Sequence, residues 1–344
     1  MIPASRAYDL CIRPHVLRWV VPLCVGTLLA IAGASSFAMS SAAAEAPTTR
    51  IYVSNYLDNT VSVVDGNTRK VVATVRVGVA PTQMAVSPDQ SSVYIANAGS
   101  NSVSVINTTN NAMARTIALP RRSRPMGVAL SPNGRDLYIA DGGSNRVSVL
   151  DTRTKRVVAS VRVGTQPVSV AVAADGKTVY AANSGSGDLS VIDARTKRIV
   201  RSIPTGGFPS GVAVTPDGAS IYVTNELSGV TVINAATGTV QERLLEPSPF
   251  SVAVSPKGDR AYVTDLGPGT LTIIDTRTHR VSSTVSIGPY GTDPFTVRAT
   301  GDAAYVADQG ANTLSVIDPS TFKVTATVAT GNSPYGIAVV QPRP

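Results

Sequence analysis

The sequence predicts an all-β protein built as a ring of seven similar units, and three observations support this. Short β-rich runs repeat every 40 to 44 residues, and each repeat unit consists of strands joined by turn signals. In addition, the chain ends with a strand that its first unit lacks. Seven units of four antiparallel strands form a seven-bladed β-propeller, because each blade then buries both faces against its neighbours. A tyrosine marks the repeat: Tyr52, Tyr94, Tyr138, Tyr180, Tyr222, Tyr262 and Tyr305.

The fourth unit shows the four expected strands most clearly, at 179–183, 189–193, 199–203 and 209–215. Val, Ile and Thr alternate in these runs with other residues, as in half-buried strands. Asp175-Gly176 and Asp217-Gly218 are typical of tight turns between strands. No stretch after residue 44 has a sustained helical period. Units of about 43 residues therefore account for the whole segment 45–344.

The two ends of the repeat predict how the ring closes. The first unit begins directly with its tyrosine strand at Ile51, without the proline-initiated strand that precedes every later tyrosine. The chain ends with such a strand at 334–340. We expect this strand to pair into the first blade, which removes two exposed sheet edges.

The first 44 residues are typical of a secretory signal peptide. Arg6, Arg13 and Arg18 precede an apolar run at 19–34, and small residues follow as far as Ala44. Cleavage after Ala44 is expected, which leaves 45–344 as the propeller and predicts a secreted, periplasmic or cell-surface protein without a membrane span. The alternative is an uncleaved anchor, but the 16-residue run is shorter than the roughly 20 residues that span a membrane.

Residue composition excludes most nucleophile and metal chemistry from the predicted propeller. Cys11, Cys24, Trp19 and His15 all lie within the predicted signal peptide, so His279 is the one histidine that follows it. His279 lies in a turn where other units have lysine, and we interpret it as a solvated turn residue. Ser-His-Asp and Cys-His systems, zinc sites and covalent c-type haem are therefore not expected. We predict no catalytic residue, no metal site and no cofactor.

Tyr222-Val-Thr-Asn225, with the recurring Val-Ser-Val-Ile-Asp and Val-Gly-x-x-Pro patterns, resembles the YVTN-repeat family of seven-bladed β-propellers. The resemblance covers all of 45–344. It implies the propeller fold but no single function, because that family includes surface-layer proteins, nucleic-acid binders, and relatives of lactonases and of dehydrogenase subunits. This chain departs from the motif where an aspartate replaces its asparagine, at Asp141, Asp265 and Asp308.

Carboxylates are the remaining candidates for acid, base or metal chemistry. Asp65, Asp151, Asp193, Asp275 and Asp318 recur at one turn position, where an aspartate hydrogen-bonds the backbone two residues on. The three motif acids are not explained in this way, because asparagine suffices at that position in the other units. They lie in different blades, however, and no run of acids resembles a calcium loop.

Arg298 is the most irregular residue of the inner strands. Its equivalents in the other six units are all alanine: Ala85, Ala129, Ala171, Ala213, Ala253 and Ala338. A guanidinium in this layer requires a carboxylate partner or an anionic ligand, because an unpaired buried charge is costly. Both alternatives, a structural ion pair and a ligand contact, follow from the sequence.

The two faces of the ring differ in composition. The Asp-Gly and Thr-Arg-Thr-Lys turns share one face and form a basic rim, which suits nucleic acid or another anionic polymer but lacks aromatic residues for stacking bases. The net charge of +8 is consistent with this rim. It comprises Arg69, Lys70, Arg153, Lys155, Arg156, Arg195, Lys197, Arg198, Arg277 and Arg280.

Aromatic residues gather on the opposite face, where they flank the prolines that begin successive inner strands. Loops on a rigid scaffold commonly bind ligands, and aromatics with a few polar groups line typical pockets. We therefore predict a monomeric exported binding module for a small molecule, surface polymer or protein, with a lactonase-like hydrolase, a redox-enzyme subunit or a nucleic-acid binder as alternatives. Its predicted site comprises Phe208, Phe250, Tyr290, Phe295, Tyr335, Arg124, Asp293 and Arg298.

Overall fold

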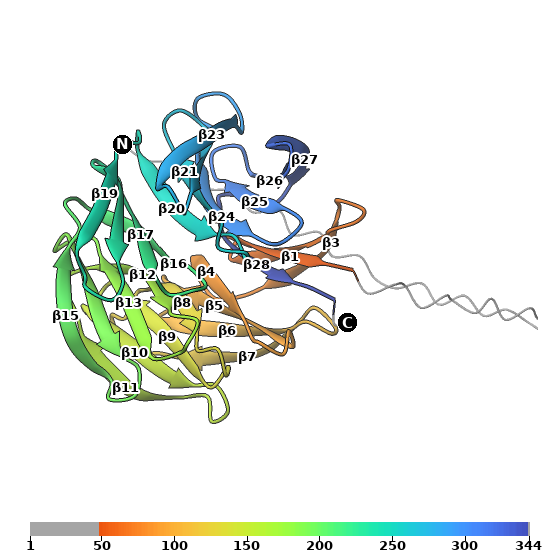
Figure 1. Cartoon of the computed structure of the whole chain (residues 1–344). Coiled ribbons are helices and arrows are strands. Elements are labelled where there is room, and N and C mark those ends of the chain that lie inside the picture. The colour runs from red at the N-terminus through yellow and green to blue at the C-terminus, as the bar shows by residue number, and fades with distance from the viewer. Residues whose placement is uncertain (1–47, 343–344) are drawn as a thin grey trace, which may run out of the picture. The chain divides into compact units, whose positions relative to one another are not determined.

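The computed structural model describes residues 48–342, so the predicted signal peptide at 1–44 lies outside the described residues. The described part folds into 28 strands arranged in seven four-stranded antiparallel sheets around a channel (Figure 1). It contains no helix, and thus no helical segment of 48–342 could cross a membrane. The predicted seven-bladed propeller is confirmed.

Each blade runs from an inner strand at the channel to an outer strand at the perimeter. Blades 1 to 4 comprise β28 Pro334–Val340, β1 Arg50–Asn55, β2 Thr60–Asp65 and β3 Val71–Arg76; β4 Pro81–Val86, β5 Ser92–Asn97, β6 Ser102–Asn107 and β7 Ala112–Ala118; β8 Pro125–Leu130, β9 Asp136–Asp141, β10 Arg146–Asp151 and β11 Arg156–Arg162; and β12 Pro167–Val172, β13 Thr178–Asn183, β14 Asp188–Asp193 and β15 Arg198–Pro204.

The remaining three blades repeat this order of strands. They comprise β16 Pro209–Val214, β17 Ser220–Asn225, β18 Gly229–Asn234 and β19 Val240–Leu244; β20 Pro249–Val254, β21 Arg260–Asp265, β22 Thr270–Asp275 and β23 Arg280–Ser286; and β24 Pro294–Ala299, β25 Ala304–Asp308, β26 Thr313–Asp318 and β27 Lys323–Ala329.

The last strand of the chain closes the ring as predicted. β28 pairs antiparallel with β1, and Ala338 lies opposite Tyr52. The inner strands β28, β4, β8, β12, β16, β20 and β24 contact one another in this order, and β24 returns to β28. Blade 1 is therefore built from both ends of the described chain.

The core lies between the blades and is made by their two middle strands. In β13 and in β9, five consecutive residues are buried, because both faces of the sheet are covered by neighbouring blades. Outer strands such as β11 alternate between exposed and half-buried residues. Seven separate hydrophobic clusters result, distributed around the ring.

A repeated turn aims each inner strand into the channel. Every inner strand begins with proline, whose missing N–H costs no ladder hydrogen bond at a first position. The residue before this proline has a positive φ in six of the seven blades, including Arg124 (44°) and Asp293 (47°). Asparagine side chains of the preceding blade accept hydrogen bonds from the N–H groups of several such residues. The pairs are Ala80 with Asn59, Arg124 with Asn101, Gln166 with Asn145, and Ser333 with Asn312.

Candidate functional site

One layer of the channel contains a single large side chain. Seven inner-strand residues lie opposite the repeat tyrosines, and six of them are alanine. The seventh, Arg298 in β24, lies opposite Tyr305. Because the alanines leave the axis open, the Arg298 guanidinium extends into the channel. The channel contains two cavities, and Arg298 lines both of them.

Arg298 has no carboxylate partner among residues 48–342. Its Nε donates to the carbonyl of Ile337 at 3.3 Å, and its Nη2 donates to the carbonyl of Met84 at 3.2 Å. No described aspartate or glutamate forms an ion pair with it, so the ion-pair interpretation is wrong within this part of the chain. The Arg298 side chain is exposed in the channel, so the buried charge expected from the sequence is not observed. The surrounding protein lowers the pKa of the guanidinium, which nevertheless stays charged. A guanidinium carries five N–H donors, so donors remain for a ligand.

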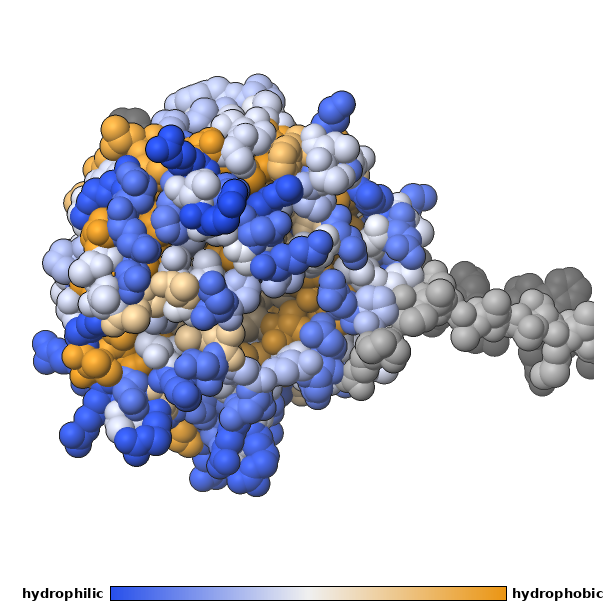
Figure 2. Space-filling view, viewed as in Figure 1, coloured by the Kyte–Doolittle hydropathy of each residue, from blue (hydrophilic) through white to orange (hydrophobic). Residues whose placement is uncertain are grey.

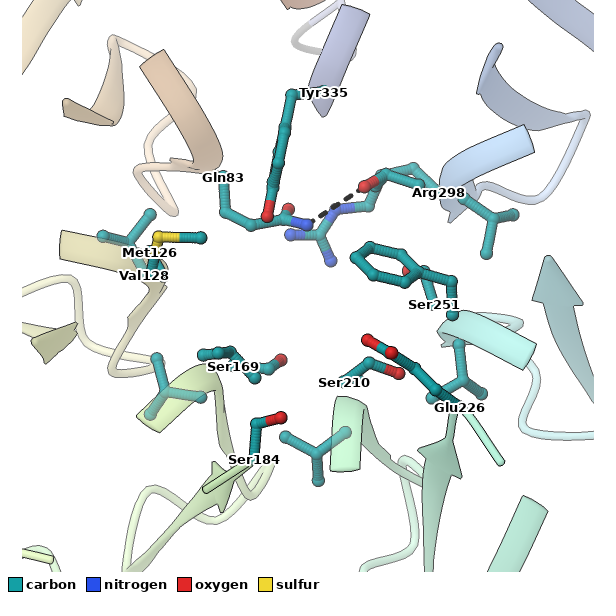
Figure 3. Close-up of a pocket in the computed structure, with 18 residues that line it drawn as sticks. Gln83, Met126, Val128, Ser169, Ser184, Ser210, Glu226, Ser251, Arg298 and Tyr335 are labelled. Carbon is teal, nitrogen blue, oxygen red and sulfur yellow. Dashed lines mark hydrogen bonds between the residues drawn. The ribbon is translucent and has the colours of Figure 1, made fainter. Parts of the chain in front are cut away.

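The cavity on the inter-blade-loop side of Arg298 has a volume of about 240 Å³. It is open to the mouth of the channel, and its wall consists of valines, Met126 and a ring of polar side chains (Figure 3). Gln83 Nε2 donates a 3.0 Å hydrogen bond to the Thr296 hydroxyl and so joins blades 2 and 7. The polar residues that line the cavity include Gln83, Ser169, Ser184, Ser210, Ser251 and Thr296.

Four aromatic rings form a continuous wall at this mouth. The ring centroids of Phe250 and Phe295 are 3.8 Å apart, and those of Phe295 and Tyr335 are 4.5 Å apart. Tyr56 stacks on Tyr335 at 5.9 Å with an interplanar angle of 27°. The separations of Tyr335 from Phe295 and from Tyr56 lie in the range at which aromatic pairs stabilise one another beyond the area they bury. Phe250 and Tyr335 also line the cavity itself, so the wall is part of the site.

An acidic side chain also lines the mouth without forming an ion pair. Glu226 follows β17 and lines the cavity, and its carboxylate has no hydrogen-bond or ion-pair partner among the described residues. Burial raises the pKa of the Tyr335 hydroxyl, and the nearby charges of Tyr56, Arg124 and Glu226 act on it as well. Arg124 is therefore close to the mouth although it does not line the cavity.

The structure places the eight predicted site residues in three groups. Phe250, Arg298 and Tyr335 line the cavity, and Phe295 packs between the two aromatics. Arg124 and Asp293 occupy the positive-φ turn before their prolines, so their backbones shape the mouth. Phe208 and Tyr290 are 50% and 88% exposed and do not line the cavity.

The polar ring inside the cavity was not predicted from the sequence. Its members Gln83, Ser169, Ser251 and Thr296 occupy the third position of their inner strands, two residues before the alanine or arginine. Because side chains two apart share one face of a strand, this position also faces the channel. The repeat alignment could therefore have located it. Gly336 holds the same position in blade 1, where a Cβ would lie 2.3 Å from the Thr82 carbonyl.

A second, wider cavity of about 950 Å³ opens on the other side of Arg298. The six channel alanines line it together with valines and the prolines of four turns that follow inner strands, Pro88, Pro132, Pro216 and Pro256. The wall is mostly apolar, and Arg298 is shared with the first cavity. In the space-filling view the surface is mainly polar, and apolar residues are visible in a hollow of the face (Figure 2). Arg298 thus lies where the two halves of the channel join.

The three motif acids are buried away from these cavities. One oxygen of Asp141, Asp265 and Asp308 accepts a hydrogen bond from a hydroxyl seven residues later, and the other oxygen has no partner within the described chain. Burial raises the pKa of Asp141 and Asp265 to about 7 and that of Asp308 to about 6. Glu246 contributes to the shift at Asp265. No three acidic, histidine or cysteine side chains of 48–342 gather as a metal site would require.

Part of the basic rim bonds to the fold itself. Lys155 Nζ and Lys197 Nζ each donate a 2.8 Å hydrogen bond to the repeat tyrosine of the preceding blade, Tyr94 and Tyr138. His279 Nδ1 lies 2.8 Å from the Tyr222 hydroxyl. His279 is therefore half-buried between two blades, in addition to being a turn residue.

Comparisons with known proteins agree with this architecture. A family model described as a YNCE-like beta-propeller matches residues 11–344. Hydrazine synthase of Kuenenia stuttgartiensis is similar in structure, with 27% identity, a TM-score of 0.70, and coverage of 78% of this chain and 92% of that one. A protein of unknown function from Desulfotomaculum acetoxidans DSM 771 has 16% identity, a TM-score of 0.70, and coverage of 86% and 100%, which shows the fold alone. Among curated proteins, none matches.

Proposed function

The chain belongs to the YNCE-like β-propeller family, and from that premise we propose that it is a binding module for a small organic anion. The ligand occupies the cavity at the inter-blade-loop mouth of the channel. A volume of about 240 Å³ equals that of about eight water molecules at roughly 30 Å³ each. The ligand is therefore a small molecule of roughly ten non-hydrogen atoms.

Arg298 is the observation that carries this proposal. Six blades have alanine at this position, so the propeller closes without a charge there. The guanidinium bonds two backbone carbonyls and keeps donors directed at the open channel. The Arg298 side chain is exposed in the open channel, so its guanidinium is accessible to a counter-charge. A carboxylate on the ligand would supply that charge, and the aromatic wall with the polar ring would hold the rest.

Binding of 3-phenylpropanoate, measured by isothermal titration calorimetry, tests the proposal. This probe carries one carboxylate and one ring that suits the wall of Phe250 and Tyr335. Arg298→Ala should weaken binding at least tenfold, because among residues 48–342 it removes the one cation that lines the cavity. Phe250→Ala should weaken it severalfold. Arg277→Ala is the matched control, since it removes an exposed rim arginine and should leave affinity unchanged.

The measurement separates binding from folding. Arg298→Ala installs the residue that six blades already have, so it should unfold cooperatively like the parent chain. Equal affinities for the parent and Arg298→Ala would contradict the proposal. Mass spectrometry of small molecules that co-purify with each protein would then identify the natural ligand.

Export of the protein is part of the same proposal. The basic, apolar and small-residue segments of 1–44 support a cleaved signal peptide. N-terminal sequencing of the protein from its native cells should give a start at Glu45. A start at residue 1 would contradict cleavage.

A subunit of a redox enzyme is the second candidate. The 27% identity to hydrazine synthase, itself an enzyme, favours it. In this candidate the propeller holds a substrate or a partner subunit, and the channel mouth is again the site. Co-purification of a second chain would favour it over the binding module.

A further inference from the structure

The mouth cavity is lined by two unpaired charges of opposite sign. Arg298 enters it from β24 in blade 7, and Glu226 enters it from the loop after β17 in blade 5. They lie on different sides of the cavity, with Tyr335 and Gln83 beside Arg298 and with Ser210 beside Glu226 (Figure 3). Neither charge has an ion-pair partner among residues 48–342, and they do not pair with each other.

Such an arrangement is complementary to a molecule that carries both charges. The Arg298 donors fit a carboxylate, as guanidinium groups do in charge-assisted pairs. The Glu226 carboxylate fits an ammonium group, which three N–H donors can bond. Phe250 lines the same cavity, and an ammonium beside an aromatic face gains a further attraction.

Resting on the proposed function, we infer that the ligand is a small zwitterion of the α-amino-acid class. Its carboxylate pairs with Arg298, its ammonium group pairs with Glu226, and its side chain lies against the aromatic wall. Ser210 and Ser251 line the same cavity, and their hydroxyls supply neutral hydrogen bonds. The cavity volume of about 240 Å³ accommodates an amino acid but not a folded peptide.

A ligand with only one charge should bind this cavity less tightly than a zwitterion. An anion alone forgoes the attraction of Glu226, and a cation alone forgoes that of Arg298, since both side chains are exposed in the cavity. A zwitterion satisfies both ends in one molecule, and the two attractions act at fixed positions. Probes that share one phenyl ring but differ in charge therefore test the inference directly through their affinities.

The experiment titrates the full chain with L-phenylalanine, 3-phenylpropanoate and 2-phenylethylamine, which differ in the charges beside one phenyl ring. Glycine and L-leucine serve as smaller zwitterions. L-phenylalanine should bind at least tenfold tighter than either singly charged probe. Glu226→Gln should reduce its affinity at least tenfold and leave 3-phenylpropanoate binding unchanged or improved. Glu242→Gln, an exposed glutamate of the same blade, is the control and should change neither.

Each of the other possible results would overturn the zwitterion inference. Arg298-dependent binding of 3-phenylpropanoate with no preference for L-phenylalanine overturns the zwitterion and leaves the anion-binding function standing. A Glu226→Gln variant that retains the preference also overturns it. Failure of all five probes to bind overturns the zwitterion and the proposed function together.

Discussion

At the residue scale, three buried acids replace the asparagine of the repeat without changing its hydrogen-bond partner. Asn97 Nδ2 donates to the Ser104 hydroxyl, whereas Asp141 accepts from Ser148, the same position one blade later. The direction of the hydrogen bond is reversed, and the hydroxyl adapts because it both donates and accepts. The carboxyl gains nothing over the amide in this contact, while its charge is costly to bury.

The raised pKa values of these acids predict a pH-dependent stability. The pKa of Asp141 and Asp265 is about 7 in the folded chain and about 4 when unfolded. Between these values the folded state binds more protons than the unfolded state, so the free energy of unfolding falls as pH rises from about 4 to about 7. Above pH 7 this contribution no longer changes.

Replacing one of these aspartates by asparagine, the residue at this position in the other blades, should remove this loss of stability at high pH. Asp141→Asn and Asp265→Asn should each raise the free energy of unfolding at pH 8, by on the order of 1–3 kcal/mol. At pH 4.5 the gain should be small. Urea unfolding at both pH values measures it, and an equal gain at both would contradict the burial argument.

Asp318→Asn provides a control of opposite sign. Hydrogen bonds from Ser320 lower the pKa of Asp318 to about 2. A lowered pKa stabilises the folded chain above about pH 4, and that stability is lost as pH falls through 2. The variant should therefore be destabilised at both pH 4.5 and pH 8.

At the element scale, one hairpin turn in each blade reaches back to the preceding blade. The turn residue between the third and fourth strands has a positive φ in all seven blades: Arg69, Asn111, Lys155, Lys197, Gly238, His279 and Phe322. Four of these side chains bond the tyrosine hydroxyl of the preceding blade. The turn thus adds a side-chain link between neighbouring blades to the hydrogen bonds that hydroxyl groups of one blade donate to the inner strand of the next.

Lys197 makes the most extensive of these contacts, with hydrogen bonds to Asp136 and to the Tyr138 hydroxyl. Lys197→Met should lower the free energy of unfolding by about 1–2 kcal/mol, because it leaves a half-buried carboxylate without its partner. A double-mutant cycle with Tyr138→Phe should give a coupling energy of about 0.5 kcal/mol or more. Lys177→Met, an exposed turn lysine nearby, is the control; additive effects would contradict the contact.

The elements could be predicted from sequence because their signals are local. Alternating β-branched residues, Asp-Gly turns and the initial proline of each inner strand define the strands to within a residue or two. The contact of His279 with Tyr222 could not be predicted, since these residues are 57 positions apart. Its signal is instead the similar spacing, 57 to 61 residues, between the tyrosine and the bonded turn residue of the following blade.

At the scale of the whole molecule, symmetry explains which parts of the site were predictable. Arg298 was found because it breaks a repeated alanine, and the aromatics were found because they flank repeated prolines. Glu226 was missed because the loop after the motif asparagine varies among blades, so no register marks it. Phe208 directly precedes the proline of β16, and Tyr290 lies in the connection before β24, but both are exposed and neither lines the cavity. The repeat does not determine the direction of side chains in these connections.

Ring closure is the remaining property of the whole molecule, and it depends on seven residues at the end of the chain. β28 supplies Ile337 and Ala338 to two different inter-blade clusters, and both are essentially buried. Arg298 and Gly336 also contact this closure, through the carbonyl of Ile337 and the hydroxyl of Ser54. Deleting 334–344 would remove this strand, expose the edge of β1 and open two clusters at once.

The truncated chain should therefore aggregate, or melt at least 10 °C below the parent, because an entire inner strand and its apolar contacts are lost. Its hydrophobic edge should also bind a dye that reports exposed apolar surface. Deleting only 342–344, beyond the end of β28, is the control and should leave the melting temperature unchanged. Adding a synthetic peptide of 334–344 in trans should restore part of the lost stability, since the strand pairs through backbone hydrogen bonds. A truncated chain that melts like the parent would show that the ring does not need its last strand.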